Sequence, residues 1–264
     1  MKKISLILAA LTAVTIFAPG ARAAQAFSKN IVGYTKVQLD AGMNLLGQQF
    51  VNVGDDAALN IQKIITSANL PGFDSSTPPI AQSEIWIYDG SYNNYYYISA
   101  ANAIAWSAPE MGGTWVDYTY QPADEVIDAS QGVWIKTEIA SEIIFSGQVY
   151  SETNATVSVI SGLNLISNPF PVVWDIQNMS SPDLIGFDSS TPPIAQSELW
   201  VYNNGSYDCY YFISEANAIA WSSPGMAGTW VDYTYTPANV TINPSKGFWL
   251  NTISPATIKF TRPN

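Results

Sequence analysis

The chain has 264 residues, of which 47% are hydrophobic, 13% aromatic and 12% charged, and its formal net charge is −11. This composition supplies apolar material for a globular core and too little charge for a disordered chain. The sequence contains no histidine and one cysteine. It therefore excludes Ser-His-Asp and Cys-His nucleophile systems, zinc sites built on these residues, and a disulfide within the chain.

The first 23 residues have the pattern of an export signal. Two lysines precede an apolar run of 15 residues, 4–18, which is shorter than the roughly 20 residues that span a bilayer as a helix. Small residues one and three positions upstream predict cleavage before Ala24. We therefore expect a secreted or cell-surface protein without a membrane span. The mature chain would carry 7 basic and 21 acidic residues, a net charge of −14, so we expect no nucleic-acid partner.

An internal duplication divides the rest of the chain. Segments 72–88 and 186–202 are identical at 15 of 17 positions, and segments 95–120 and 210–235 at 21 of 26. Such self-similarity indicates a tandem repeat, so we predict copy 1 at 27–150 and copy 2 at 151–264. No Gly/Pro/Ser-rich linker separates them, and the two copies are expected to pack closely together.

Short strands dominate the predicted secondary structure. In copy 1 we expect strands at 32–39, 43–51, 84–88, 95–99, 114–120, 132–137 and 142–149. Asp89-Gly90 predicts a hairpin, which 204–205 repeats in copy 2. One short helix, capped by Asp55 or Asp56, is expected to extend to residue 65, because the aliphatic residues there have roughly helical spacing. The predicted fold is all-β, with two tandem antiparallel sandwich-like repeats or, alternatively, small barrels.

Several short motifs accompany these strands. Residues 30–34 read NIVGY, 41–45 AGMNL, 131–135 QGVWI and 144–147 IFSG. In these motifs the chain resembles a secreted β-repeat of planctomycete- and verrucomicrobium-like bacteria, with the outline N-x-V-G-Y, A-G-x-N/S-L-x-x-x-P, G-x-G-F/Y-W, F-x-G. Copy 1 departs from it at Gln49, where copy 2 has the expected Pro169, and copy 2 lacks the N-x-V-G-Y opening. The resemblance implies a surface or matrix protein and supplies no catalytic residue.

Strand alternation places carboxylates beside tryptophans in both copies. One face of 84–88 holds Glu84, Trp86 and Tyr88, and one face of 114–120 holds Trp115 and Asp117. We expect the ligand or interface residues to be Glu84, Trp86, Tyr88, Trp115, Asp117, Glu198, Trp200, Tyr202, Trp230 and Asp232. Such a face suits a sugar or a protein partner. The alternative is that these rings pack inside the fold.

The same carboxylates are the candidates for catalysis or metal binding. A glycosidase would have to use Glu84 with Asp117, or their copy 2 equivalents, as carboxyl pairs about 5 to 9 Å apart. Two nearly identical catalytic centres in so small a protein are unusual, so we expect no enzyme and no cofactor. Asp74 and Asp188, in repeated polar loops, are weak calcium candidates, since turn capping is the commoner role of such residues.

These features predict a secreted, non-enzymatic structural or interaction protein of the cell surface or extracellular matrix. Low charge, abundant Tyr and Trp and the short junction favour self-association or contact with other surface proteins. The alternative is a lectin-like carbohydrate-binding protein with polysaccharide as its partner, which the pairing of Trp with Asp favours.

Overall fold

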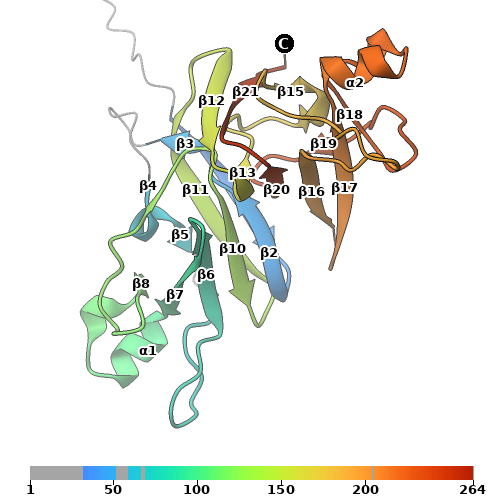
Figure 1. Cartoon of the computed structure of the whole chain (residues 1–264). Coiled ribbons are helices and arrows are strands. Elements are labelled where there is room, and N and C mark those ends of the chain that lie inside the picture. Colours follow the sequence, from blue (N-terminus) through green and yellow to red (C-terminus); the bar gives the residue numbers. More distant parts are fainter. Residues whose placement is uncertain (1–31, 52–58, 67–68, 204, 264) are drawn as a thin grey trace, which may run out of the picture.

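The computed structural model describes residues 32–51, 59–66, 69–203 and 205–263 (Figure 1). Strands make up 48% of the structure and helices 11%, which confirms the all-β prediction. The predicted signal peptide, the first residues of copy 1, Asp55 and Asp56 lie outside the described residues. Among the described helices, none has the length and apolar character needed to cross a membrane.

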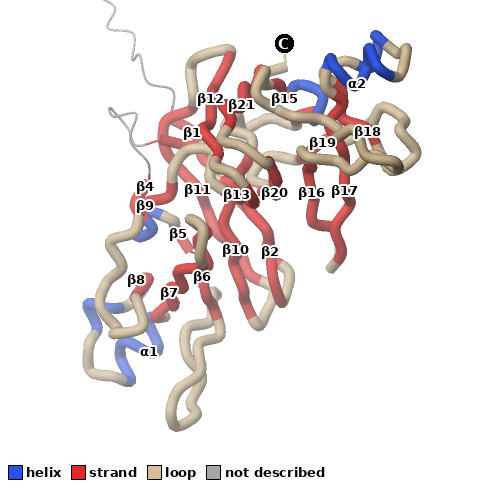
Figure 2. Tube along the Cα trace, in the orientation of Figure 1, coloured by secondary structure: helices blue, strands red, loops and turns tan. Residues whose placement is uncertain are grey.

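Copy 1 forms two main antiparallel sheets (Figure 2). The first joins β1 (Val32–Leu39), β11 (Ser141–Val149) and β3 (Phe50–Val51), and β5 (Ile65–Thr66) also pairs with β11. The second has the order β2 (Gly42–Gly47), β10 (Gly132–Thr137), β6 (Ser83–Tyr88), β7 (Tyr92–Ile98), β8 (Thr114–Val116). A separate pair joins β4 (Leu59–Asn60) to β9 (Val126–Ile127).

Copy 2 repeats this arrangement. One sheet has the order β12 (Asn154–Val159), β21 (Ala256–Thr261), β15 (Met179–Ser180). The other has the order β13 (Gly162–Ser167), β20 (Gly247–Thr252), β16 (Glu198–Asn203), β17 (Ser206–Ile213), β18 (Thr229–Val231). The separate pair is β14 (Trp174–Asp175) with β19 (Thr241–Ile242).

The two α-helices follow the equivalent strands β7 and β17. They are α1 (Ala100–Ala105) and α2 (Glu215–Ala220), and each begins with a capping box, Ser99 with Asn102 and Ser214 with Asn217. Single turns of 3-10 helix occur at η1 (Ile61–Lys63), η2 (Pro109–Met111), η3 (Ile176–Asn178) and η4 (Pro224–Met226).

The predicted helix up to residue 65 is wrong in its described part, which contains β4, η1 and β5. The reason is a tertiary hydrogen-bond set made by Gln62. Its amide nitrogen donates to the carbonyl oxygens of Trp115 (2.6 Å) and Ala123 (2.9 Å), and its oxygen accepts from the Trp115 amide (3.0 Å). These contacts attach the segment to β8. Gln177 makes the equivalent contacts to Trp230 and Ala238 in copy 2.

Most of the strands predicted for copy 1 are present, and the Asp89-Gly90 hairpin between β6 and β7 is confirmed. The predicted strand 114–120 is correct only to Val116. Beyond it the chain turns, because one Asp117 carboxylate oxygen accepts hydrogen bonds from the amides of Thr119 (2.8 Å) and Gln121 (3.1 Å).

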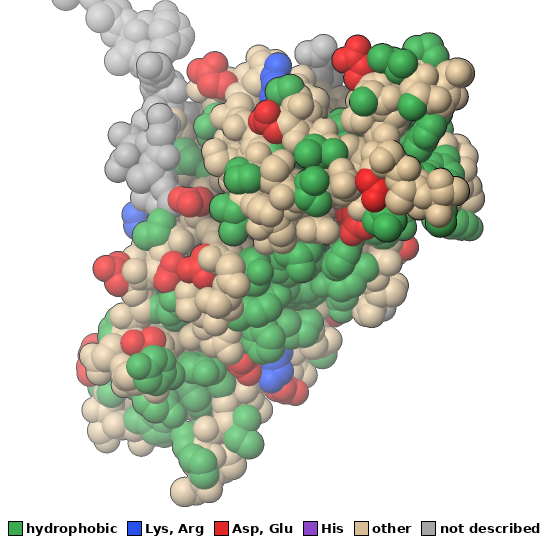
Figure 3. All heavy atoms as spheres, in the orientation of Figure 1, with side chains coloured by type: hydrophobic (Ala, Val, Ile, Leu, Met, Phe, Trp, Pro, Cys, Tyr) green, Lys and Arg blue, Asp and Glu red, His purple; other side chains and the backbone are tan. Residues whose placement is uncertain are grey.

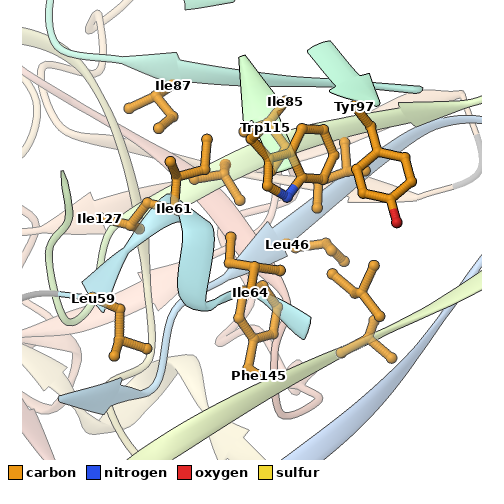
Figure 4. Close-up of a cluster of buried hydrophobic side chains, with 14 of the residues drawn as sticks. Leu46, Leu59, Ile61, Ile64, Ile85, Ile87, Tyr97, Trp115, Ile127 and Phe145 are labelled. Atoms are coloured by element: carbon orange, nitrogen blue, oxygen red, sulfur yellow. The ribbon is translucent and has the colours of Figure 1, made fainter. Parts of the chain in front are cut away.

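Each copy has its own hydrophobic core between its two main sheets. The copy 1 core includes Phe145 from β11 on one side and Ile85, Ile87 and Trp115 from the other sheet (Figure 4). The copy 2 core contains the equivalent Trp230 together with Phe248 and Phe260. Alternate residues of each strand supply these cores.

The tandem-sandwich prediction does not describe how the sheets are assembled. They form a four-bladed, propeller-like ring in place of the predicted tandem sandwich. The physical reason is that the second faces of the larger sheets are also apolar. They carry Leu45, Trp134, Leu165 and Trp249, which are buried against one another and join the two copies.

Candidate functional site

The two tryptophans expected at the centre of an exposed face, Trp115 and Trp230, are completely buried. That expectation is wrong, and the strand register explains why. Trp115 lies opposite Tyr97, on the side of the sheet that carries Ile85 and Ile87, whereas Trp86 points to the other side. The alternation within each strand was predicted correctly, but the alignment between strands was not.

Trp86, Tyr88, Trp200 and Tyr202 lie in the contact between the copies. Tyr88 of copy 1 meets Trp249 of copy 2 edge to face at 5.0 Å between ring centroids, and Trp134 meets Tyr202 reciprocally at 4.9 Å. These rings are partly buried and pack in one cluster. They form an interface within the chain.

Glu84 and Glu198 are held beside the same cluster. Glu84 accepts a hydrogen bond from the Trp86 indole (2.9 Å) and pairs with Lys136 (3.1 Å), which raises the pKa of Lys136. Glu198 accepts from Trp200 (3.1 Å). In copy 2 the residue opposite Glu198 is Asn251 in place of a lysine. Both glutamates orient a tryptophan.

Asp117 and Asp232 hold turns at the ends of β8 and β18. Hydrogen bonds from the Thr119 hydroxyl and the Gln121 amide lower the pKa of Asp117, and Thr234 and Thr236 do the same for Asp232. Trp115 and Trp86 lie on opposite sides of the sheet. The predicted single face that carries both tryptophans together with Asp117 and Glu84 therefore does not exist.

Asp74 and Asp188, the weak calcium candidates, cap their own loops. Asp74 accepts hydrogen bonds from the Ile80 amide (2.7 Å) and the Ser76 hydroxyl (2.6 Å), and these bonds lower its pKa. Asp188 makes the equivalent bonds to Ile194 and Ser190. Within the described residues, no group of three or more His, Cys, Asp or Glu side chains is placed to hold a metal ion.

An aromatic surface that the sequence reasoning missed lies near each helix. In copy 1, Phe73, Trp106 and Tyr120 contact one another, with centroid distances of 5.2, 5.8 and 6.0 Å. In copy 2, Phe187, Trp221 and Tyr235 repeat the triangle at 5.3, 5.6 and 5.8 Å. We call these triads the end clusters.

The end clusters are solvent-accessible. Trp106 is 38% exposed and Trp221 37%. In copy 1, Trp106 and Tyr120 line a hollow of about 390 Å³ with Pro79, Ile98, Ala108 and Met111. Two strongly exposed isoleucines lie near these residues in the chain: Ile80 directly follows Pro79, and Ile104 is two positions before Trp106. Their counterparts in copy 2 are Ile194 and Ile219. Isolated exposed apolar residues are common, but a contiguous group marks an interaction site.

The backbone at the end clusters is strained in the same way in both copies. Tyr120 and Tyr235 have φ values of 61° and 60°, and Ser107 and Ser222 have 58° and 55°. A non-glycine residue in this region costs of order 1 kcal/mol, and such residues concentrate at functional sites. The sequence signal that could have identified the clusters is the near-identity of 95–120 and 210–235, which covers the tryptophan and the tyrosine of each triad.

The end clusters lie far apart. Helices α1 and α2 occupy opposite ends of the molecule (Figure 1), and hydrophobic side chains are visible at both ends as well as between the copies (Figure 3). Comparison with family models, with curated proteins and with solved structures finds no match for this chain.

Proposed function

We propose that this protein is a secreted, non-enzymatic structural protein of the cell surface or extracellular matrix that associates with copies of itself, end to end. The observation that carries the proposal is the pair of exposed end clusters at opposite ends of the molecule. Export rests on the predicted signal peptide, and the matrix role is in keeping with the resemblance to secreted β-repeat proteins of planctomycete- and verrucomicrobium-like bacteria.

A second copy is the occupant that the end clusters favour. The hollow beside Trp106 is lined by apolar and aromatic residues without a charged group. The hollow itself therefore presents no like charge to a second copy, although each mature chain carries a predicted net charge of −14. The same aromatic triad occurs at both ends. Cluster-to-cluster contact is therefore self-complementary, and a molecule with two such surfaces extends into a linear chain.

The two ends are also fixed relative to each other. Buried aromatic residues join the copies, and backbone hydrogen bonds cross between them, from Gly47 to Ser245 (3.0 Å) and from Ser167 to Ser130 (2.7 Å). A rigid spacer between two identical contacts gives an assembly of constant geometry. This property suits a structural element of a surface layer.

The test uses charged substitutions at the exposed isoleucines. We expect the purified mature protein to form concentration-dependent chains in sedimentation velocity and electron microscopy. Ile104→Asp or Ile219→Asp leaves one functional end and should stop assembly at dimers, whereas the double variant should be monomeric. Ile139→Asp with Ile253→Asp is the matched control, because these isoleucines are exposed at other sites. A double variant that assembles like the unmodified protein would refute the proposal, as would an unmodified protein that stays monomeric.

Carbohydrate binding is the second candidate function. It is favoured by a tyrosine-lined groove in copy 2, which uses different residues from the end clusters.

A further inference from the structure

Copy 2 carries two adjoining hollows outside the end clusters. Two hollows of about 660 and 680 Å³ share Asp208, Tyr210 and Val240. The first lies along β17 beside segment 237–240. The second continues between the copies, where residues 40–45 of copy 1 face the end of the β16–β17 hairpin. The two hollows adjoin at these shared residues, and both copies contribute to their walls. We call the two hollows together the groove.

The lining of the groove combines aromatic rings with hydrogen-bonding groups. Tyr207, Tyr210, Tyr211 and Tyr233 line the first hollow and Tyr202 lines the second. Burial raises the pKa of Tyr207, Tyr210 and Tyr211, so their hydroxyls stay protonated and able to donate.

Acceptors are spread along the whole groove. Asp208 and Asn239 lie in the first hollow, and Asp40, Asn203 and Asn243 in the second. Asp232 also lines the first hollow, with one carboxylate oxygen already bonded to Thr234 and Thr236. Lys246 is the one basic residue among the lining residues of the two hollows.

Copy 1 differs from copy 2 at the centre of this surface. The equivalent of Tyr210 is Tyr95, whose hydroxyl donates a hydrogen bond to Glu125. In copy 2 the position of Glu125 is occupied by Val240, which has no hydrogen-bonding side chain, and the position of Asn93 is occupied by Asp208. The segments that begin at the two tyrosines, 95–120 and 210–235, are identical at 21 of 26 positions. Tyr210 therefore has the apolar Val240 at the position of the glutamate that accepts a hydrogen bond from its equivalent in copy 1. It also has the carboxylate of Asp208 two positions before it in the strand.

From these features we propose that the copy 2 groove binds a linear, neutral polysaccharide. The flat face of a tyrosine covers the C–H face of a pyranose ring, and the hydroxyl, amide and carboxylate groups exchange hydrogen bonds with sugar hydroxyls. Three carboxylates against one lysine repel anionic chains such as uronic-acid polymers and nucleic acids. Two adjoining hollows of about 660 and 680 Å³ have room for several consecutive sugar units. In a matrix, such a site would attach the protein to a glycan.

The test is isothermal titration of the full mature chain with neutral hexasaccharides of glucose, mannose and N-acetylglucosamine. We expect at least one of them to bind with one site per chain. Val240→Glu, which reproduces the copy 1 arrangement, should weaken binding roughly tenfold or more. Tyr210→Phe removes only the hydroxyl and should weaken binding severalfold. Val32→Glu is the control, because it makes the same change at an exposed position in copy 1, and it should bind like the unmodified protein.

Thermal melting of each variant shows that it is folded, and Tyr210→Phe, the smaller change, decides the test if Val240→Glu does not fold. The proposal is overturned if no neutral hexasaccharide binds, or if Val240→Glu is folded and binds unchanged. It is also overturned if hexalysine binds while the sugars do not, since the acidic groove would then be a site for cationic peptides. None of these outcomes depends on assembly through the end clusters.

Discussion

The contact between the two copies depends on glycines with no room for a side chain, and Gly247 gives the sharpest test. A Cβ atom at this position would lie 2.5 Å from the carbonyl oxygen of Leu46 and 3.2 Å from the Cδ1 atom of Leu45. Both neighbours belong to the other copy, and the first is main-chain. Gly132 is the equivalent position in copy 1, where a Cβ would lie 2.8 Å from Leu165. Each glycine opens one of the two G-x-W segments.

We expect Gly247→Ala to destabilise the folded protein. Relief of the clash requires β20 and β2 to separate by roughly 1 Å, because non-bonded heavy atoms prefer about 3.5 Å. Overpacking of this kind costs about 2–3 kcal/mol, and the lower entropy of an unfolded chain with alanine offsets about 0.5–1 kcal/mol. The net loss is about 1–2.5 kcal/mol, or roughly 2–10 °C in melting temperature for a chain of this size.

The measurement is urea unfolding followed by tryptophan fluorescence, together with a thermal melt. Gly225→Ala is the matched control, because a Cβ there meets nothing within 4 Å and copy 1 already carries Glu110 at the equivalent position. The control should be unchanged or slightly more stable. Equal midpoints for Gly247→Ala and Gly225→Ala would refute the close approach of the two copies at this glycine.

Two further predictions concern titratable groups. Hydrogen bonds lower the pKa of Asp117 and Asp232 in the folded state. These bonds stabilise the folded protein fully at a pH above the pKa of the unfolded state. The stabilisation is lost as the pH falls through the lower pKa of the folded state. Below about pH 4 the melting temperature of the unmodified protein should therefore fall more steeply with decreasing pH than that of the Asp117→Asn, Asp232→Asn double variant. Parallel plots of melting temperature against pH for the two proteins would contradict this. Burial raises the pKa of Cys209 to about 11. Iodoacetamide at pH 8 should therefore react with this thiol far more slowly in the folded protein than in the urea-unfolded protein. Equal reaction rates would show that the folded protein has an accessible thiolate.

Local features of the sequence determined a large part of the secondary structure. Alternation of aliphatic with polar or aromatic residues predicted β1, β6, β10 and β11 almost to their ends, and Asp-Gly predicted the β6–β7 hairpin. These patterns depend on neighbours in the chain, since side chains alternate along a strand and glycine accepts the positive φ of a tight turn. The duplication likewise predicted two copies of the same strand order.

Interactions between distant segments decided the rest. Gln62 forms its hydrogen bonds only when β8 is beside it, so the helical spacing before it was misleading. The alternation of residue types along a strand assigns its side chains to two faces. It does not show which of the two faces packs against another part of the protein. The register of β8 on β7 therefore sent Trp115 into the core, and packing of the copies covered Trp86 and Tyr88. The end cluster of copy 1 combines Phe73 with Trp106 and Tyr120, which lie 33 and 47 positions after it. Only the folded chain brings residues so far apart into contact.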